Sequence, residues 1–285
     1  LYLIIIKIIK MEKKDLLKDT IKHIDIKSYD STQLIDAMRD MSFTSRDTAR
    51  ATDILMMMVG EKECTNILTI AGSTSAAGCM QVYVDMVRNK MVDVVVSTGA
   101  SIIDMDLFEA LGYKHYKGHQ DVPDMQLRNL YIDRIYDTFI DEEELQACDH
   151  TTYEIANSLE PRPYSSREFI WEIGKWLHEG HAVKKDSLIQ TCYECGVPIF
   201  CPGFGIGKHQ WDHPDKHVSI DSVKDFIELT QIKIKAGTTG LFMVGGGTPK
   251  NFAQDTVVCA EILGYDVPMH KYAIQITVAD VRDGA

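Results

Sequence analysis

The most constraining feature of the sequence is a glycine-rich segment at residues 240–255, GLFMVGGGTPKNFAQD. Its apolar run at 241–244 is short enough for a buried parallel strand. Three glycines follow, and Thr248 and Pro249 then predict an N-cap and the first residue of a helix. A strand, a glycine turn and a helix N-terminus let a ligand approach the backbone and direct free N–H groups at an anion. Alone, the segment fits a tight turn and a nucleotide phosphate site equally well.

Two earlier segments repeat the pattern of a strand that ends in small residues. NILTI at 66–70 is followed by AGSTSAA, and VDVVV at 92–96 is followed by STGA. Residues 112–135 show no regular pattern. The sequence predicts further elements, which are strands at 197–201 and 272–278 and helices at 187–195 and 219–236. Alternating strands and helices indicate an α/β fold with a mostly parallel sheet and flanking helices, whose ligands bind at the carboxyl ends of the strands.

The composition excludes some classes of protein. The chain has 285 residues, of which 45% are hydrophobic and 25% charged, as in ordinary globular proteins. A net charge of −12 disfavours a general nucleic-acid binder, which would carry a basic face. The first ten residues, LYLIIIKIIK, are too short to span a membrane, and no other segment is apolar enough. We expect residues 1–10 to be an upstream extension before Met11, and residues 11–285 to form a single domain that begins with helices.

The seven cysteines are odd in number and scattered, which is typical of reduced thiols in a cytoplasmic protein. Cys192 and Cys195 form a CxxC pair that is followed by His209 and His213. These residue types could bind zinc, but a second CxxC is lacking and the histidines are irregularly spaced. We therefore expect no metal site.

Five segments together resemble the deoxyhypusine synthase family, in particular its bacterial deoxyhypusine synthase-like branch. They lie in matching order over roughly residues 60–285 and read AGSTSAAG (71–78), MVDVVVSTGA (91–100), VPIFCPG (197–203), GLFMVGGGTPKNFAQDT (240–256) and KYAIQITVADVRDGA (271–285). The resemblance implies a Rossmann-like α/β fold that binds NAD. It also implies a homotetramer with active sites at the subunit interfaces.

The resemblance also implies a reaction. The family uses NAD to take a hydride from the carbon beside the secondary amine of spermidine, and the resulting imine loses diaminopropane. The aminobutyl group passes to an enzyme lysine as a second imine and then to an amine acceptor, where the hydride returns. In eukaryotes and archaea the acceptor is a lysine of a translation initiation factor. Some relatives use putrescine instead and form homospermidine, so a protein acceptor and a small amine both stay open here.

The matching segments also assign site residues. By resemblance, the NAD-binding residues lie in the three turns and near the end of the chain, and they are Gly72, Ser73, Thr98, Gly99, Asp104, Gly245, Gly246, Gly247, Ala279 and Asp283. Asn251 stands where eukaryotic members have a histidine that contacts the reacting amine, and Asp255 follows one helical turn later. We therefore expect Asn251 and Asp255 to bind the substrate. Lys250 is expected either to contact a phosphate or to be an exposed lysine at the helix start.

Two departures from the family pattern concern the catalytic side. Ile206 stands where the family has an aspartate. The imine-forming lysine of the family follows the DGA segment in a tryptophan–glycine–lysine context, beyond Ala285, so no catalytic residue is assigned. We expect a C-terminally truncated member of the family. The alternative is a non-catalytic NAD-binding subunit of such an enzyme.

Overall fold

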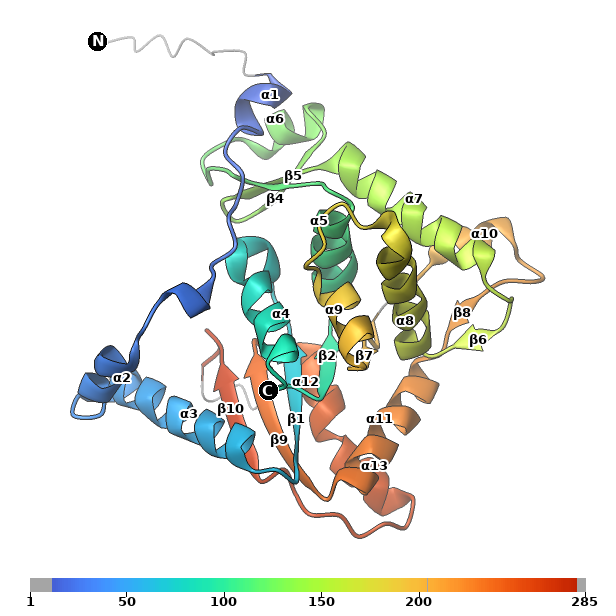
Figure 1. The fold of residues 1–285 in the computed structure, drawn as a ribbon. Helices are drawn as coiled ribbons and strands as arrows, with labels where there is room; N and C mark the ends of the chain where they lie inside the picture. The colour runs from blue at the N-terminus through green and yellow to red at the C-terminus, as the bar shows by residue number, and fades with distance from the viewer. Residues whose placement is uncertain (1–11, 204, 281–285) are drawn as a thin grey trace, which may run out of the picture.

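A computed structural model describes residues 12–203 and 205–280. In this part of the chain five parallel strands form the central sheet in the order β10-β9-β1-β2-β7 (Figure 1). The chain starts the sheet at its centre, adds two strands on one side, and then returns to add two on the other. The strands are β1 (Cys64–Ile70), β2 (Val94–Ser97), β7 (Ile199–Phe200), β9 (Thr238–Val244) and β10 (Tyr272–Ile276).

Helices cover both faces of this sheet because side chains alternate along buried strands. Leu68 and Val95 face one hydrophobic cluster, whereas Ile67 and Val94 face another. The first face is covered by α4 (Met80–Arg88), η3 (Ala100–Leu107), α5 (Phe108–Ala110), α8 (Ser166–Trp176) and α9 (Leu188–Cys195). The second face is covered by α11 (Ser222–Ala236), α12 (Gly247–Gln254) and α13 (Thr256–Ile262). The predicted α/β class with a parallel sheet and flanking helices is confirmed.

The remaining elements lie around these three layers. At the N-terminal side are α1 (Lys13–Leu16), η1 (Ile26–Ser28), α2 (Thr32–Met38) and α3 (Phe43–Gly60). Later in the chain come η2 (Ser75–Cys79), α6 (Asp124–Asn129), α7 (Glu142–Ser158), η4 (Leu177–His181) and α10 (Gly207–Asp212). None of the helices in residues 12–203 and 205–280 has the length and apolar character needed to cross a bilayer.

A second, antiparallel sheet was not predicted. Its order is β3-β5-β4, with β3 at His115–Lys117, β4 at Ile132–Ile135 and β5 at Thr138–Asp141. The less regular pattern at 112–135 thus did not reveal β3, α6 and β4. These elements are too short for periodicity to reveal, and they are held by a small core around Leu127, Ile132 and Phe139.

Two predicted helix starts are also wrong. Residues 219–220 form strand β8 (Ser219–Ile220), which pairs with β6 (Pro163–Tyr164), and α11 begins only after Asp221 accepts hydrogen bonds from two backbone N–H groups. At the glycine segment, α12 begins at Gly247 with Gly246 as its N-cap. Thr248 is therefore inside the first turn, because the glycines themselves make the change of direction.

Candidate functional site

The candidate site lies where the connection of the sheet reverses, between β1 and β9. Gly72 and Ser73 follow β1, and the three glycines follow β9, so both turns lie at the carboxyl edge of neighbouring strands. The N–H of Ala71 donates to the carbonyl of Val244 at 2.9 Å. In doubly wound sheets the crevice at such a reversal is the usual ligand site.

Gly245 keeps the two turns in close contact. Its φ is +75°, and a Cβ at this position would lie 2.8 Å from the carbonyl oxygen of Ala71. Its N–H donates to the carbonyl of Ile276 at 2.8 Å, which ties the end of β10 to the same place. Only glycine leaves this backbone open at a left-handed φ. The absence of a side chain here lets the turn after β9 pack directly against the backbone of the turn after β1.

The turn after β2 lies at the same carboxyl edge of the central sheet, next to the turn after β1. Ser101 donates from its hydroxyl to the carbonyl of Gly72 at 3.2 Å, and its N–H donates to Thr98 Oγ1 at 3.2 Å. The structure therefore brings together Gly72, Thr98 and their neighbours Ser73 and Gly99 with the glycines after β9.

Of the two C-terminal residues expected to bind the cofactor, the structure describes Ala279 alone. Ala279 follows β10 at this edge, and its N–H donates to Thr277 Oγ1 at 3.1 Å. The prediction for Asp283 lies outside the described residues.

Lys250 is not an exposed lysine. Only 6% of its surface is accessible, and its ammonium donates to Gln275 Oε1 at 3.3 Å. Gln275 in turn donates to the carbonyl of Gly245 at 3.0 Å. The expectation of an exposed helix-start lysine is wrong because the side chain turns back under the glycine turn and braces it.

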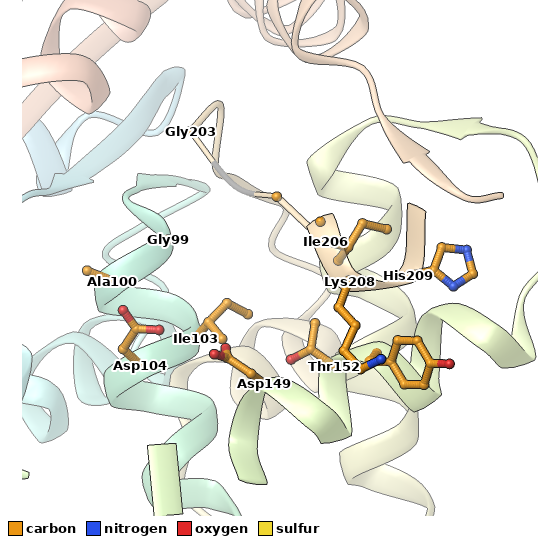
Figure 2. A pocket seen from close by; sticks show the side chains of 13 residues that line it. Gly99, Ala100, Ile103, Asp104, Asp149, Thr152, Gly203, Ile206, Lys208 and His209 are labelled. Atoms are coloured by element: carbon orange, nitrogen blue, oxygen red, sulfur yellow. The ribbon is translucent and has the colours of Figure 1, made fainter. Parts of the chain in front are cut away.

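A cavity of about 370 Å³ opens beside the turn after β2 (Figure 2). Its walls come from η3, from α7 and from the loop and helix that follow β7. The lining includes Gly99 and Asp104 among the predicted residues, together with Asp149, Tyr153 and Lys208, which were not predicted.

Two carboxylates dominate the electrostatics of this cavity. Burial, and after it the charge of Asp149, raises the pKa of Asp104 to about 6. Burial also raises the pKa of Asp149. The Lys208 ammonium lies 2.6 Å from Asp212 Oδ2 and above the Tyr153 ring, so it is already paired. Asp104 is half-buried and Asp149 is exposed at the mouth of the cavity. Two neighbouring carboxylates of like charge favour a bound cation, since a cation relieves their repulsion.

Asn251 and Asp255 line a different hollow, a groove of about 490 Å³ between α11 and α12. The two side chains share this groove, as their spacing of one helical turn predicts, and both are exposed. Pro202 lines the groove and Gly203 lines the cavity with Asp104, so the loop after β7 separates the two hollows. Within one chain the structure does not bring Asn251 and Asp255 to the Asp104 cavity.

The CxxC pair has no shared environment for a ligand. Cys192 is buried and Cys195 is exposed. Within residues 12–203 and 205–280, no group of three or more His, Cys, Asp or Glu side chains is arranged to hold a metal ion.

Fold and site together define a doubly wound α/β protein with glycine turns at the point where its sheet reverses and an acidic cavity at the same carboxyl edge. The family model for deoxyhypusine synthase matches residues 33–285. The chain belongs to the deoxyhypusine synthase family.

Relatives of known sequence or structure show to which branch of the family the chain belongs. A deoxyhypusine synthase-like protein of Coxiella burnetii (strain RSA 493 / Nine Mile phase I) is 64% identical over 280 residues, which are 96% of this chain and 80% of the relative. One of Caulobacter vibrioides is 66% identical over 284 residues, covering 96% of this chain and 77% of the relative. The crystal structure of an Entamoeba histolytica protein assigned to the deoxyhypusine synthases has a TM-score of 0.62 at 18% identity, covering 91% and 88% of the two chains. The expected family and its bacterial branch are confirmed.

Proposed function

We propose that the protein transfers an aminobutyl group from spermidine to an amine acceptor in an NAD-dependent reaction. One observation carries the proposal: the turn after β2 meets the glycine turns at the reversal of the sheet and also lines the acidic cavity. Thr98 and Gly99 join the turns of the crevice, and Gly99 and Asp104 line the cavity. A dinucleotide in the crevice and a cation in the cavity would therefore be neighbours.

The crevice fits the cofactor. Gly72 and Gly245 both have positive φ, and nothing lies within 4 Å of a Cβ at Gly72, so a dinucleotide backbone could approach the turn after β1. NAD bound there would supply the acceptor and later the donor of a hydride. The residues proposed to hold it are those of the three turns, together with Ala279 and Asp283.

The cavity fits one end of a polyamine. Above pH 6 Asp104 is ionised, and with Asp149 it offers a site for an ammonium group. The net reaction is spermidine plus R–NH₂ giving R–NH–(CH₂)₄–NH₂ plus diaminopropane. One C–N bond breaks and one forms, and the hydride that leaves the substrate returns to the product, so the overall change is redox-neutral.

Asn251 and Asp255 are proposed to contact substrate across a subunit interface of a homotetramer. Their exposure in the single chain and the separate groove that they line support this arrangement. Asn251 can donate and accept hydrogen bonds but cannot act as a base near neutral pH. We further propose that the protein works in the cytoplasm.

A small amine such as putrescine is the second candidate acceptor. It is favoured because the bacterial relatives at 64% and 66% identity are described as deoxyhypusine synthase-like proteins. A non-catalytic NAD-binding subunit is the remaining alternative, and Asn251 and Ile206 motivate it.

The experiment is to incubate the purified full-length protein with NAD and spermidine, with and without putrescine, and to quantify diaminopropane and homospermidine. Equal amounts of both with putrescine identify the small-amine reaction. Diaminopropane only with an added protein acceptor identifies protein modification. If NAD-saturated protein forms no diaminopropane under any of these conditions, the transferase proposal is wrong and the non-catalytic subunit is favoured.

A further inference from the structure

The chain between α1 and η1 crosses from the small antiparallel sheet to the helices of the first face. Figure 1 shows it running from α1 beside α6 down past α4 towards α2. Residues 19–28 are called the N-terminal strap below. The upper part lies along β3, where Lys117 N–H donates to the carbonyl of Asp19 at 2.7 Å and Ile21 N–H donates to that of His115 at 2.8 Å. The strap thus covers the free edge of the small sheet.

The lower part of the strap lies on the segment that follows the first crevice turn. Ile24 N–H donates to the carbonyl of Gly78 at 2.9 Å. A Cβ at Gly78 would lie 2.8 Å from the carbonyl oxygen of Lys22, and Gly78 has a φ of +99°. Gly78 lies in η2, which begins two residues after Ser73. The N-terminal strap therefore packs against η2, the short segment that directly follows the turn after β1.

One buried carboxylate holds the strap to the body of the protein. Glu109 is 7% exposed and has three hydrogen-bond partners from three different segments. His23 Nε2 of the strap lies 2.6 Å from Glu109 Oε2, His115 Nδ1 of β3 lies 2.8 Å from Oε1, and Lys184 Nζ lies 2.6 Å from Oε2. Burial alone would raise the pKa of Glu109, but the hydrogen bonds from His115 and His23 and the charge of Lys184 hold it well below its usual range.

Glu109 is the side-chain hydrogen-bond partner of both histidines. His23 Nδ1 and His115 Nε2 are buried, and neither has a hydrogen-bond partner among the described residues. The His23 ring is therefore oriented through the nitrogen that meets Glu109, whereas the His115 ring also packs against Phe108, with ring centroids 5.1 Å apart. A second anchor lies lower on the strap, where Lys27 Nζ donates to the buried Asp85 at 2.7 Å.

We propose that Glu109 is a latch that holds the N-terminal strap over Gly78 and thereby positions the turn after β1 for the dinucleotide. Glu109 and His23 touch neither the crevice nor the acidic cavity, so they are positioning residues. The latch itself rests only on the contacts above, whereas its effect on the cofactor rests on the proposed function.

Hydrogen exchange in the absence of ligand tests the latch. The variants are His23→Ala, His23→Gln, which restores a donor on a side chain of similar reach, and Lys22→Ala, which removes an exposed side chain from the same strap. Loss of a hydrogen bond to a charged carboxylate should speed exchange in residues 19–28 by about tenfold or more in His23→Ala. His23→Gln should recover most of the protection, and Lys22→Ala should match wild type. Equal exchange in all four proteins would overturn the latch.

NAD titration of the same proteins tests the positioning. His23→Ala should bind NAD about fivefold more weakly, and His23→Gln should bind nearly as wild type does. Unchanged affinity together with a faster-exchanging strap would leave Glu109 a latch without a positioning role. If wild type does not bind NAD, the proposed function fails and the positioning role fails with it, while the exchange comparison still decides the latch.

Substitution of Gly78 changes the same contact from the η2 side. Gly78→Ala and Gly180→Ala both place alanine at a positive φ, +99° and +112°, but only Gly78 faces the strap, because nothing lies within 4 Å of a Cβ at Gly180. Gly78→Ala should speed exchange in residues 19–28 and Gly180→Ala should not. Equal effects of the two substitutions would contradict the contact between the strap and η2.

Discussion

The three glycines after β9 have different structural roles, and alanine substitution should separate them. Gly245 combines a φ of +75° with a backbone oxygen 2.8 Å from the position of a Cβ. Gly247 has a φ of +60° but open space around a Cβ. Gly246 has a negative φ of −153°, and the nearest atom, Gln275 Nε2, is at an ordinary contact distance of 3.5 Å.

These differences give three magnitudes for the loss in free energy of unfolding. A left-handed backbone costs an alanine about 1 kcal/mol, which is the whole effect expected at Gly247. At Gly245 the close contact with the Ala71 carbonyl adds about 1–3 kcal/mol, so the total is roughly 2–4 kcal/mol. Gly246→Ala should stay within about 0.5 kcal/mol of wild type, as do most substitutions without a named strain.

Urea unfolding of the three variants measures the free energies, and NAD titration measures the consequence for the crevice. Gly245→Ala should also weaken NAD binding most, because the turns after β1 and β9 must move apart to admit the methyl group. If Gly245→Ala is as stable as Gly246→Ala and binds NAD equally well, the close contact between the two turns does not hold the crevice together.

Three further predictions concern titration and buried polar contacts. Because the pKa of Asp104 is raised to about 6, spermidine affinity should fall as the pH drops below 6, and Asp104→Asn should bind weakly at every pH without that dependence. Burial, and after it the charge of Lys233, lowers the pKa of His270 from 6.5 to about 4. The contribution of His270 to the free energy of unfolding is therefore fully present above pH 6.5, where the ring is neutral. About 3 kcal/mol of this free energy should be lost as the pH falls through 4. His270→Asn should remove this pH dependence of the free energy measured by urea unfolding. Asp106 accepts the N–H groups of Leu188 and Ile189 at 2.7 and 2.8 Å, so Asp106→Asn should cost about 1–2 kcal/mol in urea unfolding, whereas a change at the exposed Asp121 should cost nothing measurable.

The parts of the fold that the sequence predicted are those with a strong local pattern. The strands β1, β2 and β9 are runs of apolar residues that end in small ones, so both the strands and the crevice turns could be located. The gathering of these turns at one edge follows from the parallel sheet, because the carboxyl ends of parallel strands share an edge.

The parts that were missed depend on contacts distant in sequence. Asp149 lies on α7 after an acidic run that caps the start of this helix, and nothing local distinguishes it from those solvated acids. Asp149 comes close to Asp104 because α7 packs against η3. The separation of Asn251 from the acidic cavity is also a property of the packed loop after β7. Glu109 was missed for the same reason, since its partners at positions 23, 115 and 184 come from distant segments. The one local signal for an acidic site was the pair of aspartates that follows the strand at 92–96, of which Asp104 is half-buried and Asp106 is buried.

The central claim is that a dinucleotide in the crevice lies next to a polyamine in the acidic cavity. Its most direct test is to add spermidine to NAD-loaded protein and to follow the fluorescence of reduced nicotinamide, with Asp104→Asn and Asp121→Asn as the variant and its matched control. The account predicts that spermidine produces bound reduced nicotinamide in wild type and in Asp121→Asn, and much less in Asp104→Asn. Reduction that is equal in all three proteins, or none in an NAD-saturated wild type, would contradict it.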